Sequence, residues 1–334
     1  MSKIIELIKK IPKAELHIHI EGSIEPKLLF QLSKKNKIEN PYKNINEIKS
    51  AYTFHNLQSF LDIYYQGTKV LITEQDFFDL TWQYMLQCKK DNIVHSEIFF
   101  DPQTHTSRGV NFDIVVNGIY KALERAENDF GISSKIIMCF LRHLDENSAF
   151  ETLDKALSHK DKIIGVGLDS SEIGNPPSKF KNVFKKAINE GFLTVAHAGE
   201  EGSVEYIWEA LNILKVKRID HGIKCLEDEK LIQRLKENQI PLTVCPLSNI
   251  KLKVFKKLKS HNLRDLMKNN LMVTINSDDP AYFGGYLNTN LIECQKTLNF
   301  SEDEIKKLAI NSFKSSFLDE NKKKEWIDQI NNLA

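Results

Sequence analysis

Residues 13–26 read KAELHIHIEGSIEP, and this stretch places two histidines one residue apart in an apolar run that ends in an acid, a glycine and a proline. Side chains two positions apart on a β-strand point to the same face, so His17 and His19 face one side together. The other side of the strand carries Leu16, Ile18 and Ile20. The stretch predicts a buried strand whose paired imidazoles have a chelating geometry, although a lone histidine is more often a core or exposed residue.

Short apolar, β-branched runs recur along the chain and alternate with longer polar segments of helical character, which is typical of repeated βα units. Eight such runs are present, at residues 15–21, 95–100, 135–141, 165–171, 193–199, 218–222, 242–247 and 271–279. Eight is the strand number of a TIM-type barrel. An open doubly wound sheet is disfavoured because no G-x-G-x-x-G loop follows the first run. The sequence therefore predicts an α/β fold, a (β/α)8 TIM-type barrel.

Two segments lie outside the regular units and predict extra helices after the first strand and at the C-terminus. Residues 27–94 form an unusually long first connection, and the tail beyond residue 288 has helical character, with a capping box at Ser301 and Glu304. Long connections of a barrel can be lids. Six side chains of the first connection have near-helical spacing, and we expect most to be packing and a minority to cover a substrate: Phe54, Leu57, Phe60, Leu61, Tyr64 and Tyr65.

The composition is that of an ordinary globular protein, with 41% hydrophobic and 27% charged residues. The 46 basic and 45 acidic residues give a net charge of +1, so no charge excess favours nucleic acid or anionic lipid as a partner. A small neutral substrate is expected instead. No internal repeat or linker marks a boundary, and α/β barrels often exceed two hundred residues. We therefore expect one domain spanning residues 1–334, and the oligomeric state is not predicted.

The five cysteines are odd in number and widely spaced, without a C-x-x-C pair, which favours a reduced cytoplasm. The N-terminal residues lack the continuous apolar segment and cleavage site of a signal peptide. No apolar run approaches the ~20 residues that span a bilayer. We therefore expect a cytoplasmic protein without a membrane partner.

Polar groups with catalytic chemistry stand at the ends of the predicted strands, where a barrel carries its active site. His17 and His19 belong to the first run, and His197 with Glu200 follows the fifth. His221 ends the sixth run, and Asp278 and Asp279 end the eighth. Each motif alone is a weak signal, since S-D-D-P is also a common turn. Their shared position at strand ends predicts one site.

Three neutral imidazoles and one carboxylate suit Zn²⁺, whereas sites for Mg²⁺ or Ca²⁺ are richer in oxygen. We assign one Zn²⁺ per chain to His17, His19, His197 and Asp278. The other histidines show no spacing that suggests chelation and are expected to be structural or exposed: His55, His95, His105, His143, His159 and His261.

Zinc with an open position lowers the pKa of bound water from ~15.7 to ~7 and so supplies hydroxide at neutral pH. Attack on an electrophilic carbon then requires groups that move protons. We expect His221 to orient or deprotonate the water and Glu200 to protonate the substrate. Asp279 is expected to accept or share a substrate hydrogen bond. The implied reaction is hydrolytic addition at a polarised C=N or C=O.

Five motifs, ELHIHIEGS, HAGEE, RIDHGI, CPLSN and NSDDPAYFGGY, resemble the purine deaminase branch of the amidohydrolase barrels, the adenosine and adenine deaminases. The resemblance runs from about residue 12 to the C-terminal helices. It implies the same four zinc ligands, with Glu200 as proton donor to purine N1, His221 handling the hydroxide, and Asp279 near N7. Hydroxide would add at C6 and ammonia would leave. The H-x-E and P-C-x-x-C signature of the cytidine-type zinc deaminases is missing.

The choice between free base and nucleoside depends on two positions. Adenosine deaminases usually carry Asp where this chain has Glu21, and a glycine near the end of the fourth strand. This chain has Ser171 and Glu172 there, within GLDSSEIGNPP, which resembles the adenine deaminase group. A larger acid would crowd a ribose and could contact the free base, so Ser171 and Glu172 are predicted to bind substrate. The alternative for Glu172 is a surface loop acid of no consequence.

The resemblance therefore implies zinc-dependent hydrolysis of adenine, a small-molecule purine, to hypoxanthine and ammonia. The first alternative is an adenosine deaminase, which produces inosine. The second is a purine-binding protein that kept the fold and lost catalysis. A protein of this second kind should have lost Glu200 or a metal ligand, and all of these residues are present.

Overall fold

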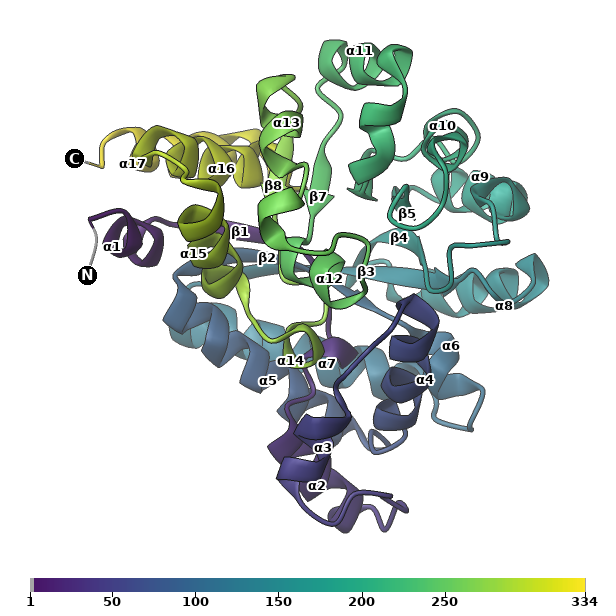
Figure 1. The fold of residues 1–334 in the computed structure, drawn as a ribbon. Coiled ribbons are helices and arrows are strands. Elements are labelled where there is room, and N and C mark those ends of the chain that lie inside the picture. Colours follow the sequence, from purple (N-terminus) through teal and green to yellow (C-terminus); the bar gives the residue numbers. More distant parts are fainter. Residues whose placement is uncertain (1–2, 334) are drawn as a thin grey trace.

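The computed structural model describes residues 3–333, in which eight parallel strands follow one another around the sheet in chain order (Figure 1). The strands are β1 (Lys13–His19), β2 (Ile93–Phe100), β3 (Ser133–Leu141), β4 (Ile163–Asp169), β5 (Leu193–Ala198), β6 (Arg218–His221), β7 (Leu242–Val244) and β8 (Val273–Ile275). Each strand coincides with one of the eight predicted runs. The predicted (β/α)8 barrel is confirmed.

The barrel closes between β8 and β1 through a very short pairing. One bridge joins Ile18 to Asp278. In it the backbone N–H of His19 donates to the Asp278 carbonyl at 3.0 Å, and the Asp278 N–H donates to the His17 carbonyl at 3.0 Å. Further down, the Leu16 N–H donates to the side-chain oxygen of Asn276 at 2.9 Å. Closure therefore fixes the Asp278 backbone directly beside the two histidines.

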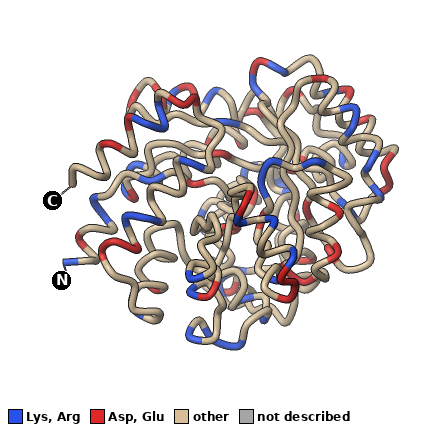
Figure 2. Tube along the Cα trace, turned by 90° about the horizontal axis from the view of Figure 1, so that it is seen from above, with Lys and Arg blue, Asp and Glu red and all other residues tan. Residues whose placement is uncertain are grey.

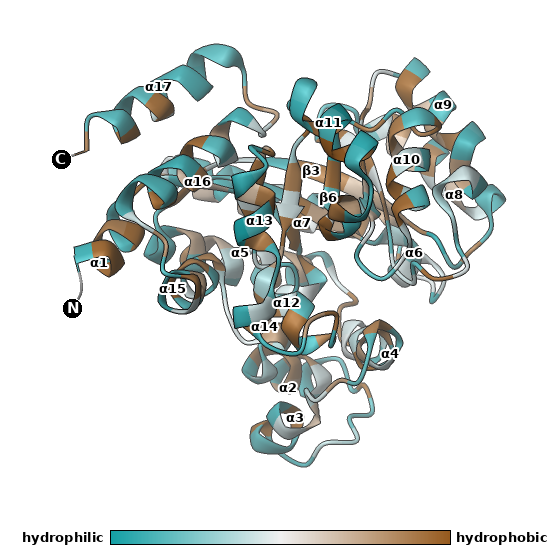
Figure 3. Cartoon of the chain, turned by 45° about the horizontal axis from the view of Figure 1, so that its top comes forward, coloured by the Kyte–Doolittle hydropathy of each residue, from teal (hydrophilic) through white to brown (hydrophobic). Residues whose placement is uncertain are grey.

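Helices follow the strands and cover the outside of the barrel. They are α5 (Glu74–Asp91), α6 (Pro102–Thr106), α7 (Phe112–Phe130), α8 (Glu146–Ala156), α9 (Lys181–Asn189), α10 (Val204–Asn212), α11 (Glu229–Glu237), α12 (Pro246–Lys251), α13 (Leu263–Lys268) and α14 (Pro280–Phe283). Hydrophilic residues colour the outer faces of helices such as α9 and α11 (Figure 3). The apolar core therefore lies between the sheet and the helices, as expected for parallel strands.

The first connection forms the predicted extra helices, which gather at one end of the molecule beside α14 (Figure 1). They are α2 (Pro26–Lys35), α3 (Ile45–Ala51) and α4 (Leu57–Thr68), and a further helix, α1 (Lys3–Lys10), precedes β1. Helix α4 begins with a capping box in which Asn56 and Ser59 bond reciprocally. This cap explains why the predicted aromatic stripe becomes helical only after Asn56.

The C-terminal helices are present as predicted, and they brace the barrel. They are α15 (Leu287–Leu298), α16 (Glu302–Lys314) and α17 (Glu320–Asn331), and the capping box at Ser301 and Glu304 opens α16. The side chain of Ser312 accepts from the Ala14 N–H at 2.9 Å. Asn311 donates to the Val273 carbonyl, also at 2.9 Å. Helix α16 is thus bonded to β1 and to β8, the two strands that close the barrel.

A buried ion pair ties the interior of the barrel together. Arg218 of β6 donates to Glu97 of β2 at 2.6 Å, and both side chains are fully buried. Arg218 also donates to the Leu16 carbonyl at 3.0 Å. Burial disfavours the charged form of Glu97, but Arg218 and then His95 outweigh it and lower the pKa of this carboxyl to about 2. The pair therefore stays charged at neutral pH.

Basic and acidic residues are interspersed along the chain (Figure 2), in keeping with the near-zero net charge. None of the helices in residues 3–333 is both long and apolar enough to cross a bilayer. All five cysteines are buried as free thiols.

We predict that Glu97→Gln lowers the free energy of unfolding at pH 7 by about 3–5 kcal/mol, because Arg218 keeps its charge and loses its nearest buried carboxylate, with Asp220 at 3.7 Å as the one that remains. The Glu97 pKa of about 2 lies below the ordinary value of 4.5, so its stabilisation is present above pH 4.5 and is lost as the pH falls toward 2. The difference between wild type and variant should narrow over that range in urea denaturation followed by circular dichroism.

The matched control is Asp129→Asn, which removes one partner of the exposed Arg125–Asp129 pair at 3.1 Å. Exposed pairs contribute at most about 1 kcal/mol, so this variant should unfold almost as the wild type does. Equal effects of the two substitutions would show that the buried pair is not a stabilising contact.

Candidate functional site

A cavity opens at the carboxyl ends of the strands. Its polar lining comes from the ends of six strands or the residues just after them: His19, Asp101, Asp169, Ser170, His197, Glu200, His221, Asp278 and Asp279. Its apolar lining is Leu57, Phe60, Leu61, Tyr64, Tyr65, Leu252 and Phe283. The cavity thus has a polar floor and an aromatic roof, and the predicted groups at strand ends converge on it.

The roof is made largely by α4, which corrects one expectation. Five of the six predicted side chains line the cavity rather than a minority of them, because α4 lies across the opening with its inward face over the strand ends. Only Phe54 lies behind this layer, where its ring packs against Phe60 at a centroid distance of 5.4 Å. Helical spacing identified the stripe but gave no information on what its buried face covers.

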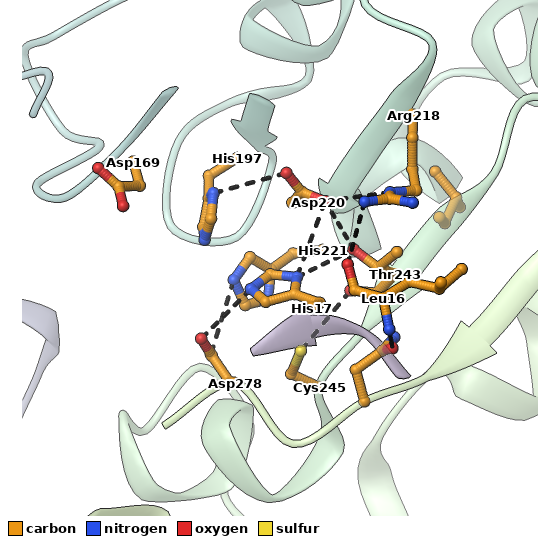
Figure 4. A network of polar contacts seen from close by, with 12 residues as sticks. Leu16, His17, Asp169, His197, Arg218, Asp220, His221, Thr243, Cys245 and Asp278 are labelled. Carbon is orange, nitrogen blue, oxygen red and sulfur yellow. Dashed lines mark hydrogen bonds and ion pairs between the residues drawn. The ribbon is translucent and has the colours of Figure 1, made fainter. Parts of the chain in front are cut away.

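The predicted metal ligands meet at the floor of the cavity (Figure 4). The Nε2 atom of His17 lies 3.2 Å from Asp278 Oδ1. The Nε2 atoms of His19 and His197 lie 3.2 Å apart, and His19 Nε2 is 3.5 Å from the same Asp278 oxygen. All four side chains are at least nine-tenths buried. Strands β1 and β5 and the turn after β8 bring these groups together.

Hydrogen bonds behind His17 fix the nitrogen that faces the cluster. The Thr243 hydroxyl donates to Asp220 Oδ1 at 2.9 Å, so it accepts from His17 Nδ1, also at 2.9 Å. His17 Nδ1 therefore carries the proton, and the buried Nε2 presents a lone pair without a hydrogen-bond donor. That lone pair faces the Asp278 carboxylate. Two acceptors facing each other at 3.2 Å fit a cation bound between them.

His221 lies as close to this cluster as the predicted ligands do. Four residues each place one nitrogen or oxygen within 4.8 Å of those of the others: His17, His197, His221 and Asp278. Within the same distance, a nitrogen of His19 lies near oxygens of Asp278 and Asp279. The structure brings the predicted ligands together and places His221 beside them. The division into four ligands and one residue that handles the water remains a prediction.

Two of these residues hold backbone conformations that L-amino acids rarely adopt. His221 has a φ of 65° and Asp278 a φ of 64°. Such positions cost on the order of 1–3 kcal/mol and persist only where the surroundings hold them. Here the β8–β1 bridge holds Asp278, and a hydrogen bond from the Gly222 N–H to the Ala198 carbonyl at 3.1 Å holds the turn after His221. The turns direct both side chains into the cavity.

Glu200 faces the cluster from the loop after β5. Its Oε2 lies 3.5 Å from His221 Nε2, and its Oε1 accepts from the Asn249 side chain at 3.1 Å. Burial first, and the Asp278 charge second, raise the pKa of Glu200 well above its usual range. A carboxyl group that keeps its proton in this position is suited to act as a general acid.

Asn249 is a residue of the site that the sequence reasoning did not single out. His261 donates from Nε2 to its side-chain oxygen at 3.1 Å, which turns the amide N–H₂ toward Glu200. The Leu263 N–H donates to His261 Nδ1 at 3.0 Å and fixes that tautomer. His261 is buried and structural, as expected. Asn249 belongs to the quoted CPLSN motif, so the signal was present without an assigned role.

Asp279 lines the cavity beside Asp278 with an oxygen, Oδ1, that has no donor in the protein. Burial and then the Asp278 charge raise its pKa well above the usual range. A Cβ atom on Gly22 would lie 1.9 Å from this oxygen. The glycine of the first motif therefore makes room for the Asp279 carboxyl.

Glu172 does not line the cavity, in contrast to the predicted substrate contact. Its carboxylate accepts four backbone N–H groups of residues 199–202, at 2.6–3.1 Å. The side chain is only 1% exposed, so Glu172 is a buried group and not a surface loop acid, and its contact with substrate stays a prediction. Glu172 holds the loop that carries Glu200. Ser171 lies in an outer depression of the surface, where its hydroxyl donates to Gln58 at 3.4 Å.

Glu21 is also turned away from the cavity. Its Oε1 accepts from the Asp101 N–H at 3.1 Å and from His105 Nε2 at 2.8 Å. Arg108 donates to the other nitrogen of His105 at 2.9 Å. Burial raises the Glu21 pKa to about 7 and lowers the His105 pKa to about 3. Glu21, which stands where adenosine deaminases usually carry Asp, thus supports the end of β2.

Two acids of the cavity were absent from the sequence predictions. Asp101 follows β2 and Asp169 ends β4, and both line the cavity. Burial is the largest cause that raises the pKa values of both acids. The second cause is the charge of Glu21 for Asp101 and the charge of Asp101 for Asp169. Both stand at the ends of predicted runs, so the rule that located the other groups applied to them as well. Neither belongs to a motif with a known metal-ligand spacing, and they were overlooked.

Comparison with known proteins places the chain among purine deaminases. A sequence model described as adenosine deaminase matches residues 12–333. The chain is 60% identical over 328 residues to an adenine deaminase of Acinetobacter baylyi, covering 98% of this chain and 99% of that protein. It is also 60% identical over 330 residues to an adenine deaminase of Wolinella succinogenes, covering 99% and 100%.

The fold matches a crystal structure of an adenine deaminase from Arthrobacter aurescens with a TM-score of 0.95 and 49% sequence identity. The match covers 96% of this chain and 98% of that one.

We predict that Glu172→Gln loosens the loop of residues 199–202, because an amide supplies one acceptor oxygen where a carboxylate receives four N–H groups. Hydrogen–deuterium exchange in this loop should accelerate, and the free energy of unfolding should fall by about 1.5–3 kcal/mol, the range for bonds to a charged group. Glu205→Gln, an exposed acid of the following helix, should leave both unchanged. Unaltered exchange in Glu172→Gln would contradict the clamping role.

Proposed function

The chain belongs to the adenosine deaminase family, and from that premise we propose that it hydrolyses adenine to hypoxanthine and ammonia. The observation that carries the proposal is the convergence, in one cavity, of imidazole nitrogens, the Asp278 carboxylate and the buried Glu200 carboxyl, whose pKa burial and Asp278 raise. A cation-binding floor facing a general acid is the arrangement that hydrolytic deamination requires. The relatives named adenine deaminases point to the free base as substrate.

The donor set of the floor fits a divalent metal, and we propose one Zn²⁺ held by His17, His19, His197 and Asp278. Neutral imidazole nitrogens with a carboxylate are ligands that Zn²⁺ prefers. When bound, the metal supplies a hydroxide nucleophile at neutral pH. Burial opposes ionisation of Asp278, but His17 and then His221 and His19 hold its pKa well below the usual range, so it remains an anionic ligand.

Proton transfers at the substrate fall to the groups around the floor. We propose that Glu200 donates its proton to N1 of adenine, which makes C6 electrophilic. His221, at 3.5 Å from Glu200, takes the proton of the attacking water. A C6–O bond forms, the proton taken by His221 passes to the amino group, and the C6–N bond breaks with release of ammonia. The remaining hydroxyl proton returns to Glu200 as the C6=O bond forms, so Glu200 regains the proton that it gave to N1. Asp279, kept protonated by burial and by Asp278, donates a hydrogen bond to N7.

We also propose that residues 1–334 work as one domain, since α16 is bonded to both strands that close the barrel. The five buried free thiols support a reducing compartment, the cytoplasm, as the place of action.

The direct test incubates the purified, zinc-loaded protein with adenine and with adenosine in separate ultraviolet assays. We predict rapid conversion of adenine, with a preference over adenosine of several orders of magnitude in kcat/KM. A closed cavity discriminates through transition-state binding, so a mismatched sugar lowers kcat/KM directly. Equal turnover of adenosine would establish the adenosine deaminase alternative. Binding of purines without turnover of either would establish the non-catalytic alternative.

Two variants should separate metal binding from proton donation. His17→Ala should lose bound zinc and activity together, because a site with one ligand fewer holds the metal much less well. Glu200→Gln should keep its zinc and lose at least ~10²-fold in rate, the effect of one general acid. Metal analysis and steady-state kinetics on the same samples measure both.

A control for the first variant is His159→Gln, which keeps a donor toward Asp113, the 2.7 Å partner of His159 away from the cavity. It should bind zinc and turn over normally. Full zinc occupancy in His17→Ala, or an unchanged rate in Glu200→Gln, would remove that residue from its proposed role.

A further inference from the structure

Asp101 and Asp169 form a pair of buried acids on the side of the cavity made by β2 and β4, and we call them the carboxyl pair. Their side chains are 3% and 2% exposed and both line the cavity. One oxygen of each lies within 4.8 Å of the other and of a His19 nitrogen. Figure 4 shows Asp169 to one side of the cluster around His17 and Asp278. The proposed chemistry uses neither acid.

Each member of the pair has one oxygen held by the protein and one without a donor. Tyr64 donates its hydroxyl to Asp101 Oδ2 at 3.1 Å, and His19 Nδ1 lies 3.5 Å from Asp169 Oδ2. The two remaining oxygens, Asp101 Oδ1 and Asp169 Oδ1, are buried and receive no N–H or O–H from any other residue of 3–333. The two carboxyls are hydrogen-bonded to each other, so a proton on one of them is shared within the pair. Buried acceptors without donors are costly and rare in native proteins. The pair is therefore built to receive donors from a bound molecule.

The position of His19 argues that this molecule is not a second metal ion. His19 Nε2 faces His197 Nε2 at 3.2 Å and Asp278 at 3.5 Å, so Nε2 is the nitrogen available to the metal cluster. A neutral imidazole that ligates through Nε2 carries its proton on Nδ1, and this N–H points to Asp169. A cation bound at the carboxyl pair would be repelled by the partial positive charge of this N–H. The free oxygens are suited to an N–H or O–H donor.

The arrangement of the strands indicates which edge of a purine the pair faces. The groups proposed to act at C6, N1 and N7 come from β1, β5, β6 and β8, whereas the carboxyl pair comes from β2 and β4. In adenine, the edge with N3 and N9 lies opposite C6. The free base carries a hydrogen at N9 in its 9H form, and a nucleoside carries the sugar there instead.

Helix α4 covers the pair, so a sugar at N9 would meet this helix. Tyr64 bonds to Asp101, and the next residue, Tyr65, bonds through its hydroxyl to Ser170 Oγ at 2.8 Å, directly after Asp169. Both tyrosines line the cavity. Two adjacent hydrogen bonds thus tie α4 down over the two carboxyls. Sugar attached at N9 would have to displace this helix.

We propose that the carboxyl pair, Asp101 and Asp169, is the subsite that accepts the N9–H of the free purine base and so selects bases over nucleosides. The inference rests on the proposed function for the placement of C6, N1 and N7. It assigns the selection to acids at the ends of β2 and β4 rather than to Glu172 or Glu21, because neither of these two residues lines the cavity.

The test compares purines that differ only at N9. Hypoxanthine and 9-methylhypoxanthine are bound to the zinc-loaded protein by titration calorimetry, which does not require turnover, and adenine and 9-methyladenine are compared in kcat/KM. We expect wild type to bind hypoxanthine about 10- to 100-fold more tightly than 9-methylhypoxanthine, because the loss of one hydrogen bond to a charged group lowers affinity by about this much. Asp101→Asn should reduce this ratio about tenfold or more, chiefly by weakening the unmethylated ligand.

Asp101→Asn is the informative variant because its carboxyl is bonded to Tyr64 rather than to a proposed metal ligand. Its zinc content should stay at one per chain. Asp101→Ala removes the carboxyl group altogether and should reduce the preference for the unmethylated purine in the same way. This variant is needed because the amide of Asn could itself form a hydrogen bond to the purine. Asp62→Asn, on the solvent-facing side of α4, should leave affinity, preference and activity unchanged.

The outcomes separate this inference from the proposed function. If wild type deaminates adenine but binds the 9-methyl purine equally well, the subsite is refuted and the function stands. If hypoxanthine binds with the expected preference but adenine is not deaminated, the subsite stands and the function fails. A second zinc equivalent that Asp101→Asn loses would identify the pair as a metal site and overturn the inference, and absence of binding by either purine would overturn both proposals.

Discussion

The backbone bridge between β1 and β8 is the constraint on which the rest of the site depends. It consists of two hydrogen bonds, from His19 to the Asp278 carbonyl and from Asp278 to the His17 carbonyl, at 3.0 Å each. A parallel ladder places side chains from neighbouring strands side by side, so closing the barrel also sets Asp278 against both histidines. The same bridge holds Asp278 at its positive φ. Barrel closure and assembly of the cation site are therefore one event, and α16 secures it from outside through Ser312 and Asn311.

Around this fixed centre, hydrogen bonds decide which buried groups remain free to react. His17 is fixed through Thr243 to Asp220, and Glu200 is oriented through Asn249 by His261. The Glu172 carboxylate takes the N–H groups of the loop that bears Glu200. Supporting partners of this kind hold a reactive group at its productive geometry, which a loop alone does not do. Three carboxyl oxygens that remain without donors, Asp101 Oδ1, Asp169 Oδ1 and Asp279 Oδ1, belong to residues that line the cavity.

The sequence was sufficient for those features that follow from local pattern. Alternating apolar runs located every strand, and the placement of His17, His197, Glu200 and Asp278 at strand ends located the cavity, because parallel strands present their carboxyl ends on one side. What depends on side-chain direction was not accessible. Glu172 follows β4 as predicted, yet its carboxylate turns toward the next loop, since the backbone N–H groups there outcompete a cavity contact. The helical spacing of apolar residues on α4 likewise does not distinguish a helix that packs against the hydrophobic core from a helix that covers a cavity.

The many carboxyls of the cavity differ in protonation because their nearest neighbours differ. Asp278 faces three imidazoles and stays ionised despite burial. Asp279 and Glu200 are buried next to that charge, and burial together with Asp278 keeps their protons on. The anionic Asp278 thus helps to make its two acidic neighbours hydrogen-bond donors. In the proposed pose, Glu200 donates to N1 and Asp279 donates to N7, on the two sides of C6. Neighbouring carboxyls therefore take opposite roles in one cavity, because burial and the Asp278 charge raise the pKa values of Glu200 and Asp279 while that of Asp278 is lowered.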